Sequence, residues 1–478
     1  MRITNMTLFS ACCFIATAFM STASVQAEEP APEMNRGRYL LLDKRIIEST
    51  DNVKLTLGAV RKDENNPLFS EGHNPWELHY NNPYLSMIYD EEEKLYKVWY
   101  SLYIRAPYED IPADQRAWQN WRYGARVGGA CYATSKDGIK WDKPKLGVVD
   151  FDGNKDNNIV LVLQHGVAVI KDLHEKDPQR RYKAILPQKT QSVVCFSPDG
   201  IHWKQQKIGR IDWGDTQQGL WWDERLQKYV LITRRWMRRP EKKRLAVRAE
   251  SSDFINWTPT QLVMEGVDRR MQVHDLIVKP YCGIYIGMIG LFDIVQSRQW
   301  VELAWSPDSI TWHRVEPGKA LIPNGPNQGD YDWGCVFSGV PIIRKDEILI
   351  YYGGADGRFM GFRTGHVCLA HMRPDGFAGY QQTSGGNNKT GSLTTKPVTV
   401  LNERLCISAD VAPSGGFIEV IALDENNKEI ATAKRINRTV TDKPLEWTKG
   451  SFKEFKDKKV RLKFVLRQSK IYSFSFQE

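Results

Sequence analysis

The sequence has few of the residues that build metal centres or disulfide frameworks. It contains 9 histidines and 8 cysteines in 478 residues. Cys12 and Cys13 lie in an N-terminal apolar segment, and the other six cysteines are widely spaced, without metal-ligand spacing. We therefore expect buried free thiols and no required cofactor. A structural Ca²⁺ held by acidic residues stays open as an alternative.

Long hydrophobic runs and a strong charge bias are also missing. After residue 27 no segment is long and apolar enough to span a bilayer. The net charge of +9 is modest for this length, and no nucleic-acid-reading motif is recognised. We therefore expect no membrane span and no nucleic-acid partner. The oligomeric state does not follow from the sequence.

The N-terminus has the layout of a targeting segment. Arg2 precedes an apolar run over residues 8–20, and Val25-Gln26-Ala27 offers a cleavage site before Glu28. This pattern predicts a secretory signal peptide at residues 1–27, and hence a secreted or periplasmic protein. The alternative, a membrane anchor, would need about 20 apolar residues.

Tryptophan, in contrast, is abundant: 15 of the 16 tryptophans lie between Trp76 and Trp333. The pattern Ser-x-Asp-x-x-x-Trp occurs four times, at intervals of 62, 54 and 55 residues, at residues 135–141, 197–203, 251–257 and 306–312. Ser and Asp side chains close turns by bonding to the backbone, while the Trp ring can pack back on a sheet. Each motif is therefore expected to join two outer strands of a repeated unit.

A second repeated feature lies upstream of these turns. Strands rich in β-branched and aromatic residues recur five times, at residues 94–100, 180–186, 227–233, 283–289 and 346–352. Each follows a polar turn and an earlier strand, so the unit has four strands over about 50–60 residues. We predict an all-β chain with a five-bladed β-propeller at 61–384; a two-layer sandwich is the alternative.

The ends of the chain differ from the repeated region. A Gly/Asn/Ser-rich linker near residue 385 precedes alternating strands, which predict a small antiparallel β-sandwich at 385–478. We expect it to act as a structural support first and a binding module second. The strand-like segment at 28–60 either closes the ring or packs on this sandwich.

Polar residues that begin the innermost strands are the catalytic candidates, because these strands converge on the propeller axis. The candidates are Glu77, Asp215, Asp275 and Asp332, with His165 at the matching place in the second unit. Carboxylates around one axis repel each other, which separates their pKa values as acid–base catalysis requires. Two such carboxyls in a Trp-rich cleft favour glycoside hydrolysis. The alternative is that each Asp only forms a turn.

Other residues near these positions are expected to bind substrate. They are Trp76, Asn82, His165, Trp213, Gln217, Arg234, Arg270, His274 and Trp333. Arginine suits a bidentate grip on carboxylate or sulfate, which favours an anionic sugar. The alternative is solvated charge and pairing to the protein's own Asp residues. The insertion at 102–126 is interpreted as a partly helical lid.

The predicted architecture and the segment GHNPWELHYNNPY resemble the arabinanase, levansucrase and invertase group of glycoside hydrolases (families 43 and 32). The resemblance implies a five-bladed propeller with Glu77 as base or nucleophile and an acid in the third blade, where this chain has Asp215. We hypothesise Asp215 or Asp275 as the acid and Asp332 as an orienting carboxylate. The Ser-x-Asp turns also resemble the Asp-boxes of sialidases, with Gly one residue early.

The expected function is therefore an exported glycoside hydrolase acting on a poly- or oligosaccharide, by carboxylate acid/base catalysis. Two alternatives stay open. A non-catalytic glycan-binding propeller would bind oligosaccharide without turnover. A glycoside phosphorylase would use phosphate, held by arginines, in place of water.

Overall fold

The structure of the protein is a computed structural model, which describes residues 37–105, 126–163, 166–187, 191–212, 214–237, 242–383 and 389–477. These residues form strands β1 to β35, and their helical segments are three-residue 3-10 turns. The all-β prediction is confirmed. The predicted signal peptide, His165, Trp213 and most of the predicted lid lie outside the described residues.

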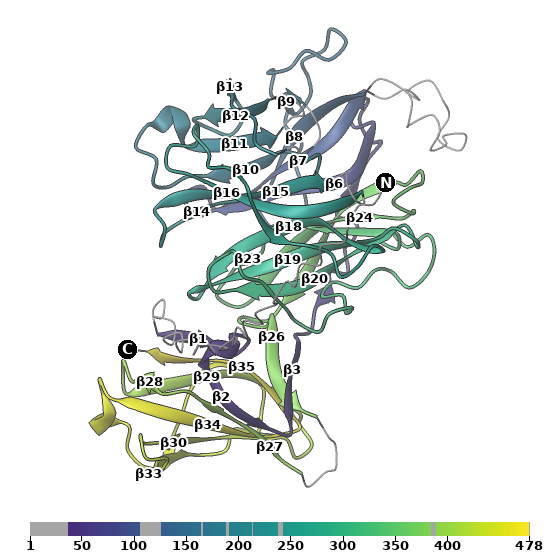
Figure 1. The fold of residues 1–478 in the computed structure, drawn as a ribbon. Helices are drawn as coiled ribbons and strands as arrows, with labels where there is room; N and C mark the ends of the chain where they lie inside the picture. The colour runs from purple at the N-terminus through teal and green to yellow at the C-terminus, as the bar shows by residue number, and fades with distance from the viewer. Residues whose placement is uncertain are drawn as a thin grey trace, which may run out of the picture.

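The larger part of the molecule, at the top of Figure 1, consists of five antiparallel units that we call blades 1 to 5. Blade 1 comprises β6 (His79–Asp90), β7 (Leu95–Arg105), β8 (Val127–Ser135) and β9 (Ile159–Leu163). Blade 2 comprises β10 (Ala168–Lys171), β11 (Tyr182–Pro187), β12 (Ser192–Ser197) and β13 (Lys204–Ile208). Blade 3 comprises β14 (Gly219–Asp223), β15 (Lys228–Met237), β16 (Lys243–Ser251) and β17 (Gln261–Met264).

Blades 4 and 5 are joined into one ten-stranded sheet by a parallel pair between Gln299 and Cys335. Blade 4 comprises β18 (Met271–Tyr281), β19 (Ile284–Asp293), β20 (Arg298–Ser306) and β21 (His313–Arg314). Blade 5 comprises β22 (Cys335–Ser338), β23 (Ile342–Ile343), β24 (Ile348–Ala355) and β25 (Gly365–Met372). Its outer edge is completed by β4 (Arg61–Lys62) and β5 (Phe69–Ser70), which pair with β25 and precede blade 1 in the sequence.

Hydrophobic packing joins each blade to the next around a ring. Separate buried clusters lie between blades 1 and 2, 2 and 3, 3 and 4, 4 and 5, and 5 and 1. On β7, for example, Val98 and Tyr100 face the cluster shared with blade 5, whereas Trp99 faces the one shared with blade 2. Both faces of each blade are therefore covered, which explains why the strands read as continuous apolar runs.

The four Ser-x-Asp turns have the expected geometry and also link blades. In the turn of blade 2, Asp199 accepts hydrogen bonds from the backbone N–H groups of Ile201 and His202, at 2.8 Å each. The indole of Trp99 in blade 1 donates to the carbonyl of Gly200 in this turn, at 2.7 Å. Equivalent donors reach the turns of blades 1, 3 and 4 from the preceding blade, namely Tyr351, Arg180 and Arg248. The repeat thus stabilises both the hairpin and the contact between blades.

Asp253→Ala, in the turn of blade 3, is expected to lower the free energy of unfolding by about 1 kcal/mol at pH 7. Burial opposes ionisation of Asp253, but hydrogen bonds from the backbone of Asn256 and Ile255 outweigh it and lower its pKa to about 2. This stabilisation is present above the unfolded pKa and is lost as the pH falls from about 4 to about 2. Urea denaturation across this range measures it. Asp253→Asn, which keeps an acceptor oxygen, should cost less; equal stability of wild type and Asp253→Ala would contradict the prediction.

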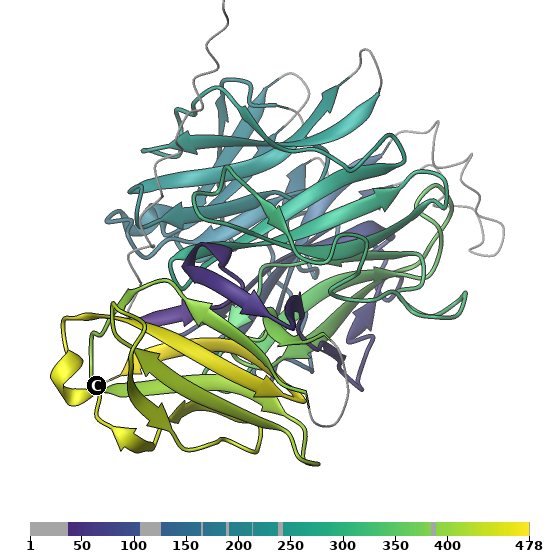
Figure 2. The same ribbon diagram turned by 60° about the horizontal axis from the view of Figure 1, so that its bottom comes forward.

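The remaining strands form two sheets that pack face to face below the blades (Figure 2). One sheet contains β1 (Arg38–Leu40), β3 (Val53–Leu57), β26 (Ala378–Gln382), β29 (Arg404–Val411), β32 (Val440–Pro444) and β35 (Ser469–Gln477). The other contains β2 (Ile47–Asp51), β27 (Gly391–Thr395), β28 (Val398–Thr399), β30 (Phe417–Leu423), β31 (Glu429–Ala433), β33 (Trp447–Gly450) and β34 (Lys459–Arg467). The strands of residues 38–57 thus pair with strands of the sandwich, so this segment packs on the sandwich. The ring is completed instead by the next two strands, β4 and β5, which pair with β25 of blade 5.

Candidate active site

A polar cluster lies where the first halves of the inner strands meet, and His274 is at its centre. The pairing of β18 with β19 shifts register between Val273 and Asp275, so His274 is the extra residue of a β-bulge. Bulges often redirect a side chain next to an active site. The His274 ring contacts the rings of Tyr84 from blade 1 and Phe337 from blade 5, and Thr216 from blade 3. The bulge therefore brings His274 among side chains from three other blades.

Asp275 follows directly and supports this histidine. Its Oδ2 atom lies 2.7 Å from Nδ1 of His274, and the amide of Gln299 donates to the same oxygen at 3.4 Å. The carboxyl packs over Gly290, where a Cβ atom would lie only 2.5 Å from it. Burial raises the pKa of Asp275 to about 7, although the charge of Arg234 and the bond from Gln299 act in the opposite direction. A carboxyl with this pKa is partly protonated at neutral pH, which is a requirement for a general acid.

Two arginines of blade 3 lie near this site: the charge of Arg234 acts on Asp275, and Arg244 lies beside Arg234. Arg234, on β15, forms an ion pair with the carboxylate of Asp215, whose side chain is 47% exposed. Arg244, on β16, donates to the neutral amide of Gln272 at 2.8 Å. Both guanidinium groups lie against the ring of Trp236, at 4.9 and 4.5 Å from its centre. Burial lowers the pKa of Arg234 to about 10 and, with the charge of Arg234, that of Arg244 to about 9. Arg234 thus has a half-exposed carboxylate as its partner, whereas the partly buried Arg244 has a neutral amide. We call Asp215, Arg234, Arg244, His274 and Asp275 the axial cluster.

Blade 1 supplies the opposite side of this cluster. The amide of Asn82 donates to the hydroxyl of Tyr84 at 2.8 Å, and Arg363 from blade 5 donates to the Asn82 carbonyl. Gln217, before β14, bonds to the backbone of Leu85 across the ring. Asn82 and Gln217, both expected to bind substrate, are thus engaged in contacts between blades.

Glu77 occupies a different place. Its carboxylate is fully buried and accepts hydrogen bonds from Lys143 at 2.6 Å, Tyr100 at 2.7 Å, Tyr80 at 3.0 Å and Asn74 at 2.6 Å. These partners belong to the packing of blade 1, and none belongs to the axial cluster. We infer that Glu77 forms a structural ion pair.

Asp332 has the same surroundings in blade 5. It pairs with Lys62 at 2.5 Å and accepts from Tyr352 at 2.9 Å and from the backbone of Gly325. Its side chain is buried, and these contacts again lie outside the axial cluster. Of the four predicted carboxylates, Asp215 and Asp275 thus both lie near Arg234. Glu77 and Asp332 have separate partners.

Three residues that were expected to bind substrate, namely Trp76, Arg270 and Trp333, contact other parts of the protein. The indole of Trp76 donates to Asn158 in blade 1. Arg270 grips the carboxylate of Asp293, with Nη2 2.6 Å from Oδ2. Trp333 stacks under Arg298, which also donates to the Trp333 carbonyl. Their side chains are thus engaged at the ends of strands rather than with Asp275.

Tyr84, Arg244 and Arg363 belong to this region but are not predicted by the sequence. Tyr84 is the last residue of the quoted GHNPWELHYNNPY segment, and Arg244 ends a run of basic residues. In sequence neither differs from a core tyrosine or a solvated charge. Within the described ranges, no group of three or more His, Cys, Asp or Glu side chains could hold a metal ion, and no helix is long and apolar enough to cross a membrane.

No protein-family model matches this chain, and no curated protein matches it. Solved structures with a similar fold include a protein described as a glycoside hydrolase, 14% identical, with a TM-score of 0.46 over 70% of this chain and 94% of the other. A family 43 arabinoxylan arabinofuranohydrolase from Bacillus subtilis is 12% identical, with a TM-score of 0.42 over 87% and 97%. A fructofuranosidase from Schwanniomyces occidentalis is 10% identical, with a TM-score of 0.38 over 90% and 98%. Function has to be argued from the site, because one fold serves many chemistries.

Proposed function

We propose that this chain is an exported glycoside hydrolase that acts on an anionic glycan at the axial cluster. The observation that carries the proposal is the pair of unlike carboxyls around Arg234. Asp275 is buried, with a pKa raised to about 7, whereas Asp215 is half-exposed and ion-paired. Carboxyls whose environments differ in this way are the usual acid and base of glycoside hydrolysis.

The chemistry assigns one step to each carboxyl. Asp275 gives its proton to the leaving glycosidic oxygen as the bond from this oxygen to the anomeric carbon breaks. Asp215 takes a proton from the attacking water, or attacks the anomeric carbon first and is released by water. His274 holds the Asp275 carboxyl through the 2.7 Å contact and acts as a positioning residue.

The arginines support an anionic substrate. Arg234 is buried and ion-paired with Asp215, whereas the partly buried Arg244 donates to the neutral amide of Gln272 and has no ion pair among the described residues. A buried cation without an acidic partner is costly, so a uronate or sulfate group beside Arg244 would stabilise it. The ring of Trp236, against which both guanidinium groups lie, adds an apolar side chain to this region.

Arg244→Gln is expected to raise KM for an acidic glycan by about 10- to 100-fold, because one charged hydrogen bond is lost, while kcat changes little. Arg235→Gln is the matched control: this neighbouring arginine pairs with Asp212 and points to Thr260. It should leave KM unchanged. Equal effects of the two substitutions would contradict the assignment of Arg244.

The function itself is tested by incubating the purified full chain with matched acidic and neutral polysaccharides and measuring released sugars. Release from acidic substrates without added phosphate supports the proposal. Release that requires phosphate would indicate a phosphorylase, for which the same two arginines could hold the phosphate ion. Saturable binding without release, unaffected by Asp275→Asn, would indicate a glycan-binding module.

A further inference from the structure

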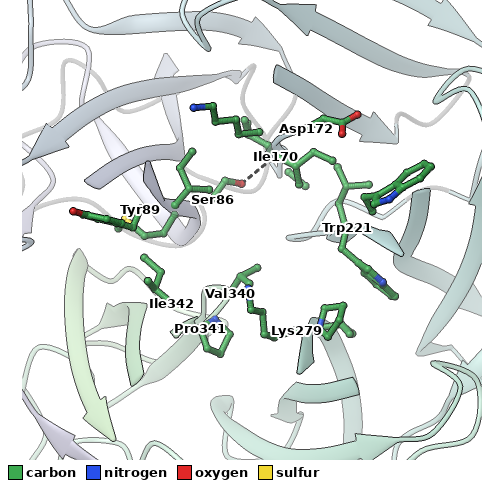
Figure 3. A pocket seen from close by; sticks show the side chains of 18 of the residues that line it. Ser86, Tyr89, Ile170, Asp172, Trp221, Lys279, Val340, Pro341 and Ile342 are labelled. Atoms are coloured by element: carbon green, nitrogen blue, oxygen red, sulfur yellow. Dashed lines mark hydrogen bonds between the residues drawn. The ribbon is translucent and has the colours of Figure 1, made fainter. Parts of the chain in front are cut away.

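A cavity of about 710 Å³ opens at the other end of the inner strands (Figure 3). It is lined by the last residues of β6, β10, β14 and β18 and by residues 340–344 of blade 5. Lys279 in this cavity follows Asp275 by four residues on β18, which places the two about 13 Å apart along the strand. The contact between Gln217 and Leu85 crosses the ring between the two levels. The cavity is therefore separate from the axial cluster.

One level of this cavity is a belt of five equivalent residues, one from each blade. The five residues occupy equivalent positions because each pairs with the second or third residue of the next strand in its blade. The pairs are Ile88 with Lys97, Ile170 with Lys183, Trp221 with Val230, Lys279 with Ile286, and Ile342 with Leu349. Four of the five belt residues are large and apolar, and all five line the cavity. Lys279 replaces the apolar residue in blade 4.

The acidic residues around the cavity do not neutralise this lysine. Asp90 is bound by Lys97 and Lys171, at 2.9 and 2.8 Å, and Asp172 by Lys183 at 2.7 Å. Glu91, Glu92 and Glu224 also have basic partners, namely Lys94 and Arg344, Lys171, and His174.

The ammonium group of Lys279, by contrast, makes no hydrogen bond or ion pair within the described ranges. Burial lowers the pKa of its ammonium group. The cavity therefore holds an apolar belt with one uncompensated cation.

We propose that this cavity binds a small monocarboxylate with an apolar body. The carboxylate pairs with Lys279, and the body packs against Ile88, Ile170, Ile342 and Trp221. The volume is that of a small-molecule site, which is usually apolar with a few placed polar groups. The described acids around the cavity are already paired, so a bound carboxylate would supply the negative charge that Lys279 lacks.

The test is calorimetric titration of the full chain with decanoate, below its micelle concentration, and with decyltrimethylammonium, which has the same tail and the opposite charge. Saturable binding of decanoate at one site per chain, with at least about tenfold weaker binding of the cation, is expected. Lys279→Met, which gives the belt an apolar fifth residue, should weaken decanoate binding by about tenfold or more, and Lys279→Arg should retain it.

Equal binding of anion and cation, no decanoate binding, or unchanged binding to folded Lys279→Met would each overturn the proposal. If Lys279→Met does not fold, the comparison of decanoate with decyltrimethylammonium on the wild-type protein still tests the proposal. Glycan hydrolysis by Lys279→Met should equal that of wild type, because Lys279 is outside the axial cluster. A failure of the proposed hydrolase activity therefore leaves this inference independently testable.

Discussion

Replacing Asp275 with asparagine is expected to lower kcat/KM on the glycan substrate by about 10²- to 10⁴-fold, the usual contribution of a general acid. Asparagine keeps the size of the side chain and can still contact His274 and Gln299, but it has no proton to give. The measurement is steady-state release of reducing sugar by variants with unchanged circular dichroism. Retention of full activity by a folded Asp275→Asn protein would remove Asp275 from the mechanism.

The pH dependence gives this prediction a second readout. Because burial raises the pKa of Asp275 to about 7, the protonated form is lost above that pH. We expect kcat/KM of the wild type to fall as the pH rises through about 7, and this fall to be absent from the residual activity of Asp275→Asn. A wild-type profile that stays flat from pH 5 to 9 would contradict the role of Asp275 as acid.

Stability should respond to the same group without any substrate. The raised pKa means that the folded state binds a proton that the unfolded state releases, so stability is lost as the pH rises from about 4 to about 7. For a shift of this size the change is roughly 4 kcal/mol. Asp275→Asn should lack it, so the variant gains stability relative to wild type across this range. Denaturant unfolding at pH 4, 5.5 and 7 measures the difference.

Glu77→Gln is expected to have the opposite profile: a large loss of stability with little loss of kcat. The substitution removes one partner of a buried ion pair and leaves the Lys143 ammonium beside Tyr100 without its carboxylate. Breaking such a pair from one side costs about 3–5 kcal/mol. Urea unfolding of the full chain measures the loss, and kcat is compared at a temperature where the variant is folded.

The double variant Glu77→Gln/Lys143→Met is the matched control. It removes both charges, so it should recover much of the stability that Glu77→Gln alone loses. A fall in kcat by Glu77→Gln as large as that of Asp275→Asn, in folded protein, would restore Glu77 to the catalytic machinery and contradict the structural role inferred here.

The repeated unit could be predicted because its signals are local. A Ser and an Asp two residues apart close a turn by hydrogen bonds within five residues, as Ser197 and Asp199 do. Alternation along β7 sends Val98 and Trp99 to different clusters, so apolar strands at a fixed spacing already indicate stacked sheets. The pairing of β3 with β26, in contrast, joins residues more than 300 positions apart, and no local pattern specifies it.

The candidate site was only partly predictable, for a similar reason. Asp215, Arg234, His274 and Asp275 were named from their positions near strand ends, and they do lie together. Glu77 has the same kind of position in the sequence. It differs because Lys143, 66 residues away, faces its carboxylate. Whether an acid is catalytic or structural depends on such a distant partner.

The sequence by itself determined an all-β chain of repeated hairpins, because turn chemistry and side-chain alternation act between residues close in the chain. Only the tertiary structure decided which carboxyl keeps its proton and which cation lacks a partner. These properties depend on burial and on charges from other blades, as Asp275 near Arg234 and Lys279 within its apolar belt illustrate. Such electrostatic environments exist only after folding has brought distant strands to one axis.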